Sequence, residues 1–129
     1  MKVTKTIREY IEKKVYEKAM NSDSMLELER KAKEEQDRFD ADVKAIEEKC
    51  KPLIQGLVDK YSSCICESRK PYVSIRGFDT YVLPEGVAYR EARIKMNAKV
   101  RDAVQEIIVE MELGGTKAEL MEKLDALKF

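Results

Sequence analysis

Three cysteines are the residues of this sequence best suited to chemistry, and two of them form the close pair Cys64-Ile65-Cys66. A structural zinc site takes four ligands, usually with C-x-x-C spacing, whereas this chain offers C-x-C and the remote Cys50. Cys50 falls on an apolar helix stripe, where a free cysteine packs as a small hydrophobic side chain. We therefore expect no metal and no cofactor. A metal shared between two copies and a redox role for the close pair stay open as alternatives.

The second chemical feature is that the sequence contains no histidine. This excludes Ser-His-Asp and Cys-His catalysis, the H-E-x-x-H zinc helix and the Glu-x-x-His di-iron bundle. Neither a G-x-x-x-x-G-K-[ST] nor a G-x-G-x-x-G phosphate-binding motif occurs. The carboxylates and amines that remain alternate along helix faces as solvated i,i+4 pairs, namely Glu27/Lys31, Glu29/Lys33, Glu34/Arg38 and Asp40/Lys44. We expect a protein that is not an enzyme.

Composition indicates a folded helical protein of the cytoplasm. Charged residues make up 39% of the 129 positions and apolar residues 43%, too many apolar residues for a disordered chain. An odd number of cysteines is typical of reduced thiols rather than a secreted disulfide framework. The N-terminal segment is charged throughout, unlike a signal peptide, and no apolar run reaches the 18 or so residues of a membrane span.

Hydrophobic periodicity predicts an all-α fold in a single domain of residues 1–129. T-x-x-E and S-x-x-E capping boxes at Thr6, Ser24 and Thr116 mark helix starts, and Gly114-Gly115 ends the third helix because glycine readily follows a C-cap. The expected helices span about 4–20, 24–62, 85–113 and 116–127. The two short terminal helices present apolar stripes of their own, Ile7, Ile11, Val15 and Ala19 in the first and Leu120, Leu124 and Leu127 in the last.

The longest expected helix carries the clearest pattern, a heptad seam with one polar member. Its members are Ala32, Gln36, Phe39, Val43, Ile46, Cys50, Leu53 and Leu57. Pro52 removes a backbone donor and crowds the preceding turn, so we expect a kink near 48–52. Because the seam resumes in phase, a kink is favoured over the end of the helix. The helix at 85–113 repeats the spacing with Tyr89, Met96, Val100, Ala103, Ile107 and Met111.

These lengths predict a long antiparallel helical hairpin, in which the seams of 24–62 and 85–113 pack together along their whole length. Two narrow seams cannot enclose a core alone. Either the short terminal helices complete a four-helix bundle, or a second copy completes a coiled-coil-like homodimer. The connector at 63–84 concentrates turn and aromatic residues, and a small β-hairpin at 72–82 or an irregular loop is expected there.

The connector is also the basic part of a chain with zero net charge. Residues 68–101 hold eight arginines and lysines against three acids, whereas residues 102–129 hold three against seven. Cations beside aromatic rings can receive a peptide or stack on bases. The expected partner-binding residues are Arg69, Tyr72, Arg76, Phe78, Tyr81, Arg90 and Arg93. The plainer interpretation is that these arginines solvate a helix while the aromatic rings fill the end of the bundle.

The function expected from these features is a non-enzymatic protein-protein interaction module that presents its basic aromatic connector to a macromolecular partner. A nucleic-acid-binding protein using the same patch is one alternative, although overall neutrality and acidic helix residues would repel a long polyanion. A structural coiled-coil oligomer is another. The N-terminal TIREYIEKKV, about a dozen residues, is similar in style to small accessory proteins of phages and other mobile elements. That similarity implies a binder or inhibitor of a host or viral protein.

Overall fold

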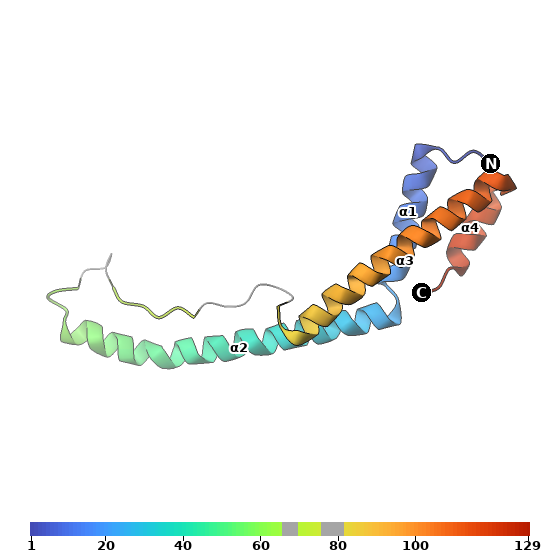
Figure 1. Ribbon diagram of the computed structural model, residues 1–129. Helices are drawn as coiled ribbons and strands as arrows, with labels where there is room; N and C mark the ends of the chain where they lie inside the picture. The colour runs from blue at the N-terminus through green and yellow to red at the C-terminus, as the bar shows by residue number, and fades with distance from the viewer. Residues whose placement is uncertain (66–69, 76–81) are drawn as a thin grey trace.

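The computed structural model describes residues 1–65, 70–75 and 82–129, and these residues form an all-α structure (Figure 1). Its helices are α1 (Lys5–Met20), α2 (Asp23–Lys60), α3 (Pro84–Gly114) and α4 (Lys117–Ala126). Helices α1, α3, α4 and the start of α2 pack into a bundle at one end of the molecule, which we call the base. The rest of α2, residues 40–60, projects from the base, and we call it the arm (Figure 1). Both chain termini lie at the base.

The core of the base is a stripe of α3 that packs against α1 on one side and the beginning of α2 on the other. The expected apolar stripes of the short helices are confirmed: Ile11, Val15 and Ala19 are fully buried, and Leu120 and Leu124 of α4 are 3% exposed. The expected stripe of α3 is confirmed for Tyr89, Met96, Val100, Ile107 and Met111, with Ala103 partly buried. Because two helices contact α3, the stripe is wider than one seam and also buries Val104 and Ile108.

The predicted lengthwise packing of α2 on α3 is wrong for the arm. The α2 residues buried in the core are Met25 and Ala32, both close to its N-terminus, whereas Ile46, Leu53 and Leu57 of the predicted seam are exposed. The physical reason is the length of the segment between the helices. Residues 61–83 are numerous enough, at up to about 3.3 Å each, to span the length of the arm, which allows α3 to begin beside Glu35 rather than at the tip.

Helix α2 continues through Pro52 without a break, in agreement with a seam that stays in phase across the proline. Figure 1 shows it as one gently curved rod. The sequence predicts a β-hairpin at 72–82. Residues 72–75, the described part before its turn, form no strand, and residues 76–81 lie outside the described residues.

The predicted starts of α1 and α2 are within one residue of those observed, but the two predicted capping residues are wrong by two residues. Thr4, rather than Thr6, caps α1, where its Oγ1 accepts a hydrogen bond from the N–H of Ile7 at 3.4 Å. Ser22, rather than Ser24, precedes α2. The third prediction is confirmed, since Thr116 Oγ1 accepts from the N–H of Glu119 at 3.2 Å. In all three helices the hydroxyl residue just before the first helical residue adopts the extended conformation that an N-cap requires.

The acid–base pairing on α2 also differs from the expected i,i+4 ladder. Arg30 pairs with both Glu27 and Glu34, three residues before and four residues after it, and therefore replaces Lys31 and Arg38 as their partner. A guanidinium presents several donors in a fork, so one arginine can bind two carboxylates. These groups are about half exposed, and such pairs contribute little to stability.

Candidate interaction surface

The connector lies against the arm of α2. A hydrogen bond joins the two segments, and a shallow groove runs between them. The backbone N–H of Ile75 donates to Glu47 Oε1 at 3.3 Å. A groove of about 530 Å³ lies nearby between the arm and the connector, and its lining residues are Lys51, Pro52, Ile54, Gln55, Lys70, Pro71 and Tyr72. The described part of the connector is thus an extended segment that runs along one flank of the arm (Figure 1).

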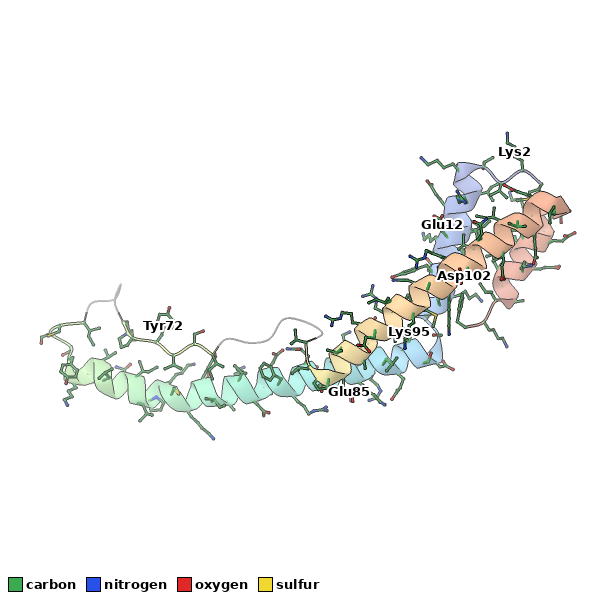
Figure 2. All side chains as sticks on the ribbon, in the orientation of Figure 1. Lys2, Glu12, Tyr72, Glu85, Lys95 and Asp102 are labelled. Atoms are coloured by element: carbon green, nitrogen blue, oxygen red, sulfur yellow. The ribbon has the colours of Figure 1, made fainter. Side chains whose placement is uncertain are left out.

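Tyr72 is a highly exposed member of the predicted partner-binding residues that the structure describes. It lies on the arm-bound segment with 83% of its surface accessible, beside the half-exposed Val73 and the exposed Lys70. Arg90 and Arg93 lie instead on α3, between the labelled Glu85 and Lys95, well away from Tyr72 (Figure 2). Arg93 sits over the ring of Tyr89, 5.8 Å from its centroid. The structure therefore does not bring Tyr72 and these two arginines into one patch.

The other predicted partner-binding residues, Arg69, Arg76, Phe78 and Tyr81, lie outside the described residues. Cys66 is outside them as well, while Cys50 is a half-buried free thiol and Cys64 an exposed one. Within residues 1–65, 70–75 and 82–129, no three histidine, cysteine or acidic side chains gather as a metal site would require.

The arm itself exposes an apolar stripe that periodicity had assigned to the core. Ile46 is 50% exposed, Leu53 76% and Leu57 46%. Seven- and four-residue spacings place these side chains on one face of the helix. The half-buried arm residues Glu47 and Ile54 lie on the neighbouring flank, and this flank faces the connector. We call the exposed stripe Ile46, Leu53 and Leu57 the arm ridge.

Electrostatics of the arm are those of solvated ion pairs. Lys51 Nζ donates to Glu48 Oε1 at 2.8 Å, and this hydrogen bond, helped by the charge of Lys51, lowers the pKa of the Glu48 carboxyl. The same contact raises the pKa of Lys51. Both side chains are more than half exposed, so the pair keeps both groups charged near neutrality without building a reactive site.

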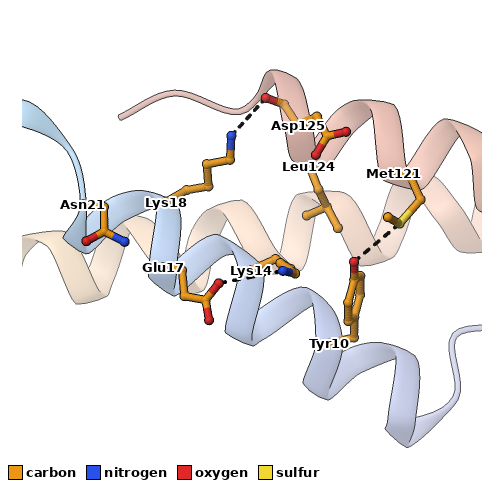
Figure 3. Close-up of a pocket in the computed structure, with 8 residues that line it drawn as sticks. All are labelled: Tyr10, Lys14, Glu17, Lys18, Asn21, Met121, Leu124 and Asp125. Atoms are coloured by element: carbon orange, nitrogen blue, oxygen red, sulfur yellow. Dashed lines mark hydrogen bonds and ion pairs between the residues drawn. The ribbon is translucent and has the colours of Figure 1, made fainter.

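Sequence periodicity missed a second surface feature, a groove between α1 and α4 (Figure 3). Tyr10 crosses this groove and its hydroxyl donates to Met121 Sδ at 3.5 Å, while Lys18 Nζ donates to the carbonyl oxygen of Asp125 at 3.1 Å. A more apolar pocket of about 490 Å³ adjoins it, lined by Met1, Thr6, Ile7, Tyr10, Lys117, Leu120 and Met121. Tyr10 and Met121 lie beside the apolar stripes of their helices and are not members of them. Heptad spacing therefore gave no signal for these two residues.

Comparison with known proteins identifies no relative of this chain. No family model, no curated protein and no solved structure matches it. Among the helices of the described residues, none has the apolar length needed to cross a membrane.

Proposed function

We propose that the protein is a non-enzymatic interaction module, in which the packed base holds the arm and its connector out toward a protein partner. The observation that carries this proposal is the exposure of Tyr72 on an extended segment fixed to the arm. A tyrosine combines a large apolar face with a polar tip and loses little side-chain freedom on binding, properties that make it frequent at interaction sites.

The charges around Tyr72 favour a partner with an acidic patch over an extended polyanion. Lys70 lies exposed two residues away, and Lys51 lines the same groove. Glu47 and Glu48 lie on the same arm within two turns of Lys51. A compact acidic protein surface can approach Lys70 alone, whereas a long nucleic acid would also meet these carboxylates.

Affinity capture from the native host, read by mass spectrometry, tests this proposal. The variant Lys70→Glu/Tyr72→Ala should lose the partner that the unaltered chain retains. The matched control is Lys13→Glu/Tyr16→Ala, which makes the same substitutions at exposed positions of α1. Equal circular dichroism of all three proteins establishes that the helices are intact. Capture unaffected by the connector variant, or lost equally in the control, would contradict the proposal.

Fluorescence titration with single- and double-stranded oligonucleotides tests the nucleic-acid alternative. Binding through phosphates weakens steeply as salt rises because counterions are released. We expect no binding at low salt. Binding that is lost on adding salt and on introducing Lys70→Glu/Tyr72→Ala would replace the protein partner with a nucleic acid.

A further inference from the structure

The arm ridge is a continuous apolar face that the described part of the chain leaves uncovered. Ile46, Leu53 and Leu57 are 50%, 76% and 46% exposed, and the connector lies on the adjacent flank. The same residues occupy the a and d positions of a heptad pattern, which is the arrangement by which one helix packs against another. An exposed apolar stripe of this kind marks an interaction surface.

The chain exposes more surface than a compact monomer of the same mass, and the excess is large enough for a stable interface. A compact monomer of 14.9 kDa exposes about 7,000 Å² by the usual scaling of surface with mass, whereas this chain exposes 9758 Å². The excess of about 2,700 Å² is more than the roughly 800 Å² that each partner buries in a standard stable interface. The arm projects from the base (Figure 1) and therefore contributes to this exposed surface.

Gly56 provides a separate indication that another helix packs close to the arm. Glycine in a helix interior weakens the helix relative to alanine, yet a Cβ added at Gly56 would meet no other atom within 4 Å. The described part of this chain therefore gives no packing reason for glycine at this position. Gly56 lies next to the ridge on the side away from the connector, and a close approach of a second helix is a situation that requires a residue without a side chain.

We infer that a second copy of this chain covers the arm ridge, forming an antiparallel pair of α2 arms. In the register that buries the whole ridge, Ile46 packs against Leu57 of the second copy and Cys50 packs against its Leu53. The two-fold axis repeats both contacts, which gives four consecutive apolar layers. Gly56 then faces Lys49 of the second copy, whose aliphatic stem can lie across it.

Charges beside the ridge select the antiparallel orientation. A parallel pair in register would place Asp42 against Glu47 of the second copy at flanking heptad positions, and like charges there oppose assembly. In the antiparallel register, Lys60 of the second copy comes level with Val43 on the side of the ridge where Asp42 lies. The pair therefore gains an Asp42–Lys60 contact at each end instead of a repulsion.

The length of the arm agrees with this register. Glu35 marks the level at which α3 begins, because it accepts the hydrogen bond from the N–H of Glu85. The helix of the second copy ends at Lys60, level with Val43, about 12 Å short of Glu35 at 1.5 Å per residue. The second arm thus fills the open part of α2 and stops before the base, and each connector stays accessible on its own flank.

Light scattering coupled to size exclusion tests the inference over a concentration series of the full chain. The expected mass is twice 14.9 kDa. Leu53→Glu should return the protein to the monomer mass, whereas Leu113→Glu, the same substitution at an 83% exposed leucine of α3, should leave the dimer unchanged. A monomer at every concentration, or equal effects of the two variants, would overturn the inference.

Charge variants test the orientation, and a cysteine variant tests the register. Asp42→Lys should weaken the dimer, and the exchange Asp42→Lys/Lys60→Asp should restore it. In a background in which Cys50 is alanine and Cys64 and Cys66 are serine, Ile46→Cys/Leu57→Cys should form disulfides between residues 46 and 57 of different copies on oxidation. Peptide mapping that finds 46–46 and 57–57 links would contradict the antiparallel pair.

Discussion

Glu35 of α2 caps the first turn of α3, because its Oε1 accepts a 2.9 Å hydrogen bond from the backbone N–H of Glu85, fifty residues later in the chain. The N-cap residue Leu83 has no side-chain acceptor and Pro84 has no N–H to offer. The N–H of Glu85 is one of the free donors that every helix start leaves, and a carboxylate there also faces the positive end of the helix dipole. This contact marks the level along α2 at which the third helix begins.

Glu35→Ala should lower the free energy of unfolding by about 1–2 kcal/mol, the range observed when an N-cap acceptor is lost. Glu35→Gln keeps an acceptor but loses the charge, so it should recover part of that loss. Urea denaturation followed by circular dichroism measures both. An alanine variant as stable as the unaltered chain would show that the contact does not anchor α3.

Truncating core side chains of the base should lower the free energy of unfolding much more than truncating a surface side chain. Ile11→Ala and Ile107→Ala remove side chains that are 0% and 2% exposed, and each should cost about 2–5 kcal/mol of unfolding free energy. Leu113→Ala, at an exposed position of α3, should change it by less than about 0.5 kcal/mol. The same denaturation measurement applies, and similar losses at all three positions would disprove the assignment of the core.

Glycine-to-alanine changes at two positions should act in opposite directions. Gly114 has a φ of +143°, which alanine adopts only with strain, so Gly114→Ala should destabilise by about 1–3 kcal/mol. Gly56 lies inside α2 with open space around it, so Gly56→Ala should stabilise the arm by up to about 1 kcal/mol. The second change is best measured in the Leu53→Glu background, where no second copy contacts the arm.

The pairing of Glu27 with Arg30 should appear as an acid-dependent contribution to stability. The hydrogen bond from Arg30 lowers the pKa of the Glu27 carboxyl below its ordinary value. A lowered folded-state pKa means that the pair stabilises above the unfolded-state pKa, and that this contribution is lost as pH falls through the folded-state pKa. A carboxyl titration by NMR should find a lowered midpoint that returns to normal in Arg30→Gln; an unchanged midpoint in that variant would contradict the assignment.

Periodicity was sufficient to predict the helices and the buried stripes of α1, α3 and α4, because each of those stripes has one packing solution within the chain. It was insufficient for α2. A heptad stripe shows that a face such as Ile46 to Leu57 is apolar, but the partner of that face depends on where the chain returns. The return is set by the contacts of Ile75 and Glu85 with Glu47 and Glu35, and hydrogen bonds of that kind have no sequence pattern.

The candidate surface was predictable to a smaller degree. Tyr72 is exposed as expected of a partner-binding residue, but its separation from Arg90 and Arg93 follows from the position at which α3 begins (Figure 2). Closeness in sequence predicts that the connector residues and the first turns of the next helix form one patch. In three dimensions the extended segment carries Tyr72 out along the arm, while the arginines stay with the base.

A helix that leaves its bundle partway along is stabilised unevenly from end to end. The first turns of α2 are anchored by Met25 and Ala32, so their amide protons are expected to exchange with solvent only when the whole base unfolds. In the monomer, amides of the outer turns rest on helical hydrogen bonds and one flanking segment, and brief local openings that begin at Lys60 are sufficient to expose them. We therefore expect two cooperative units of different stability within a single unbroken helix of the monomer.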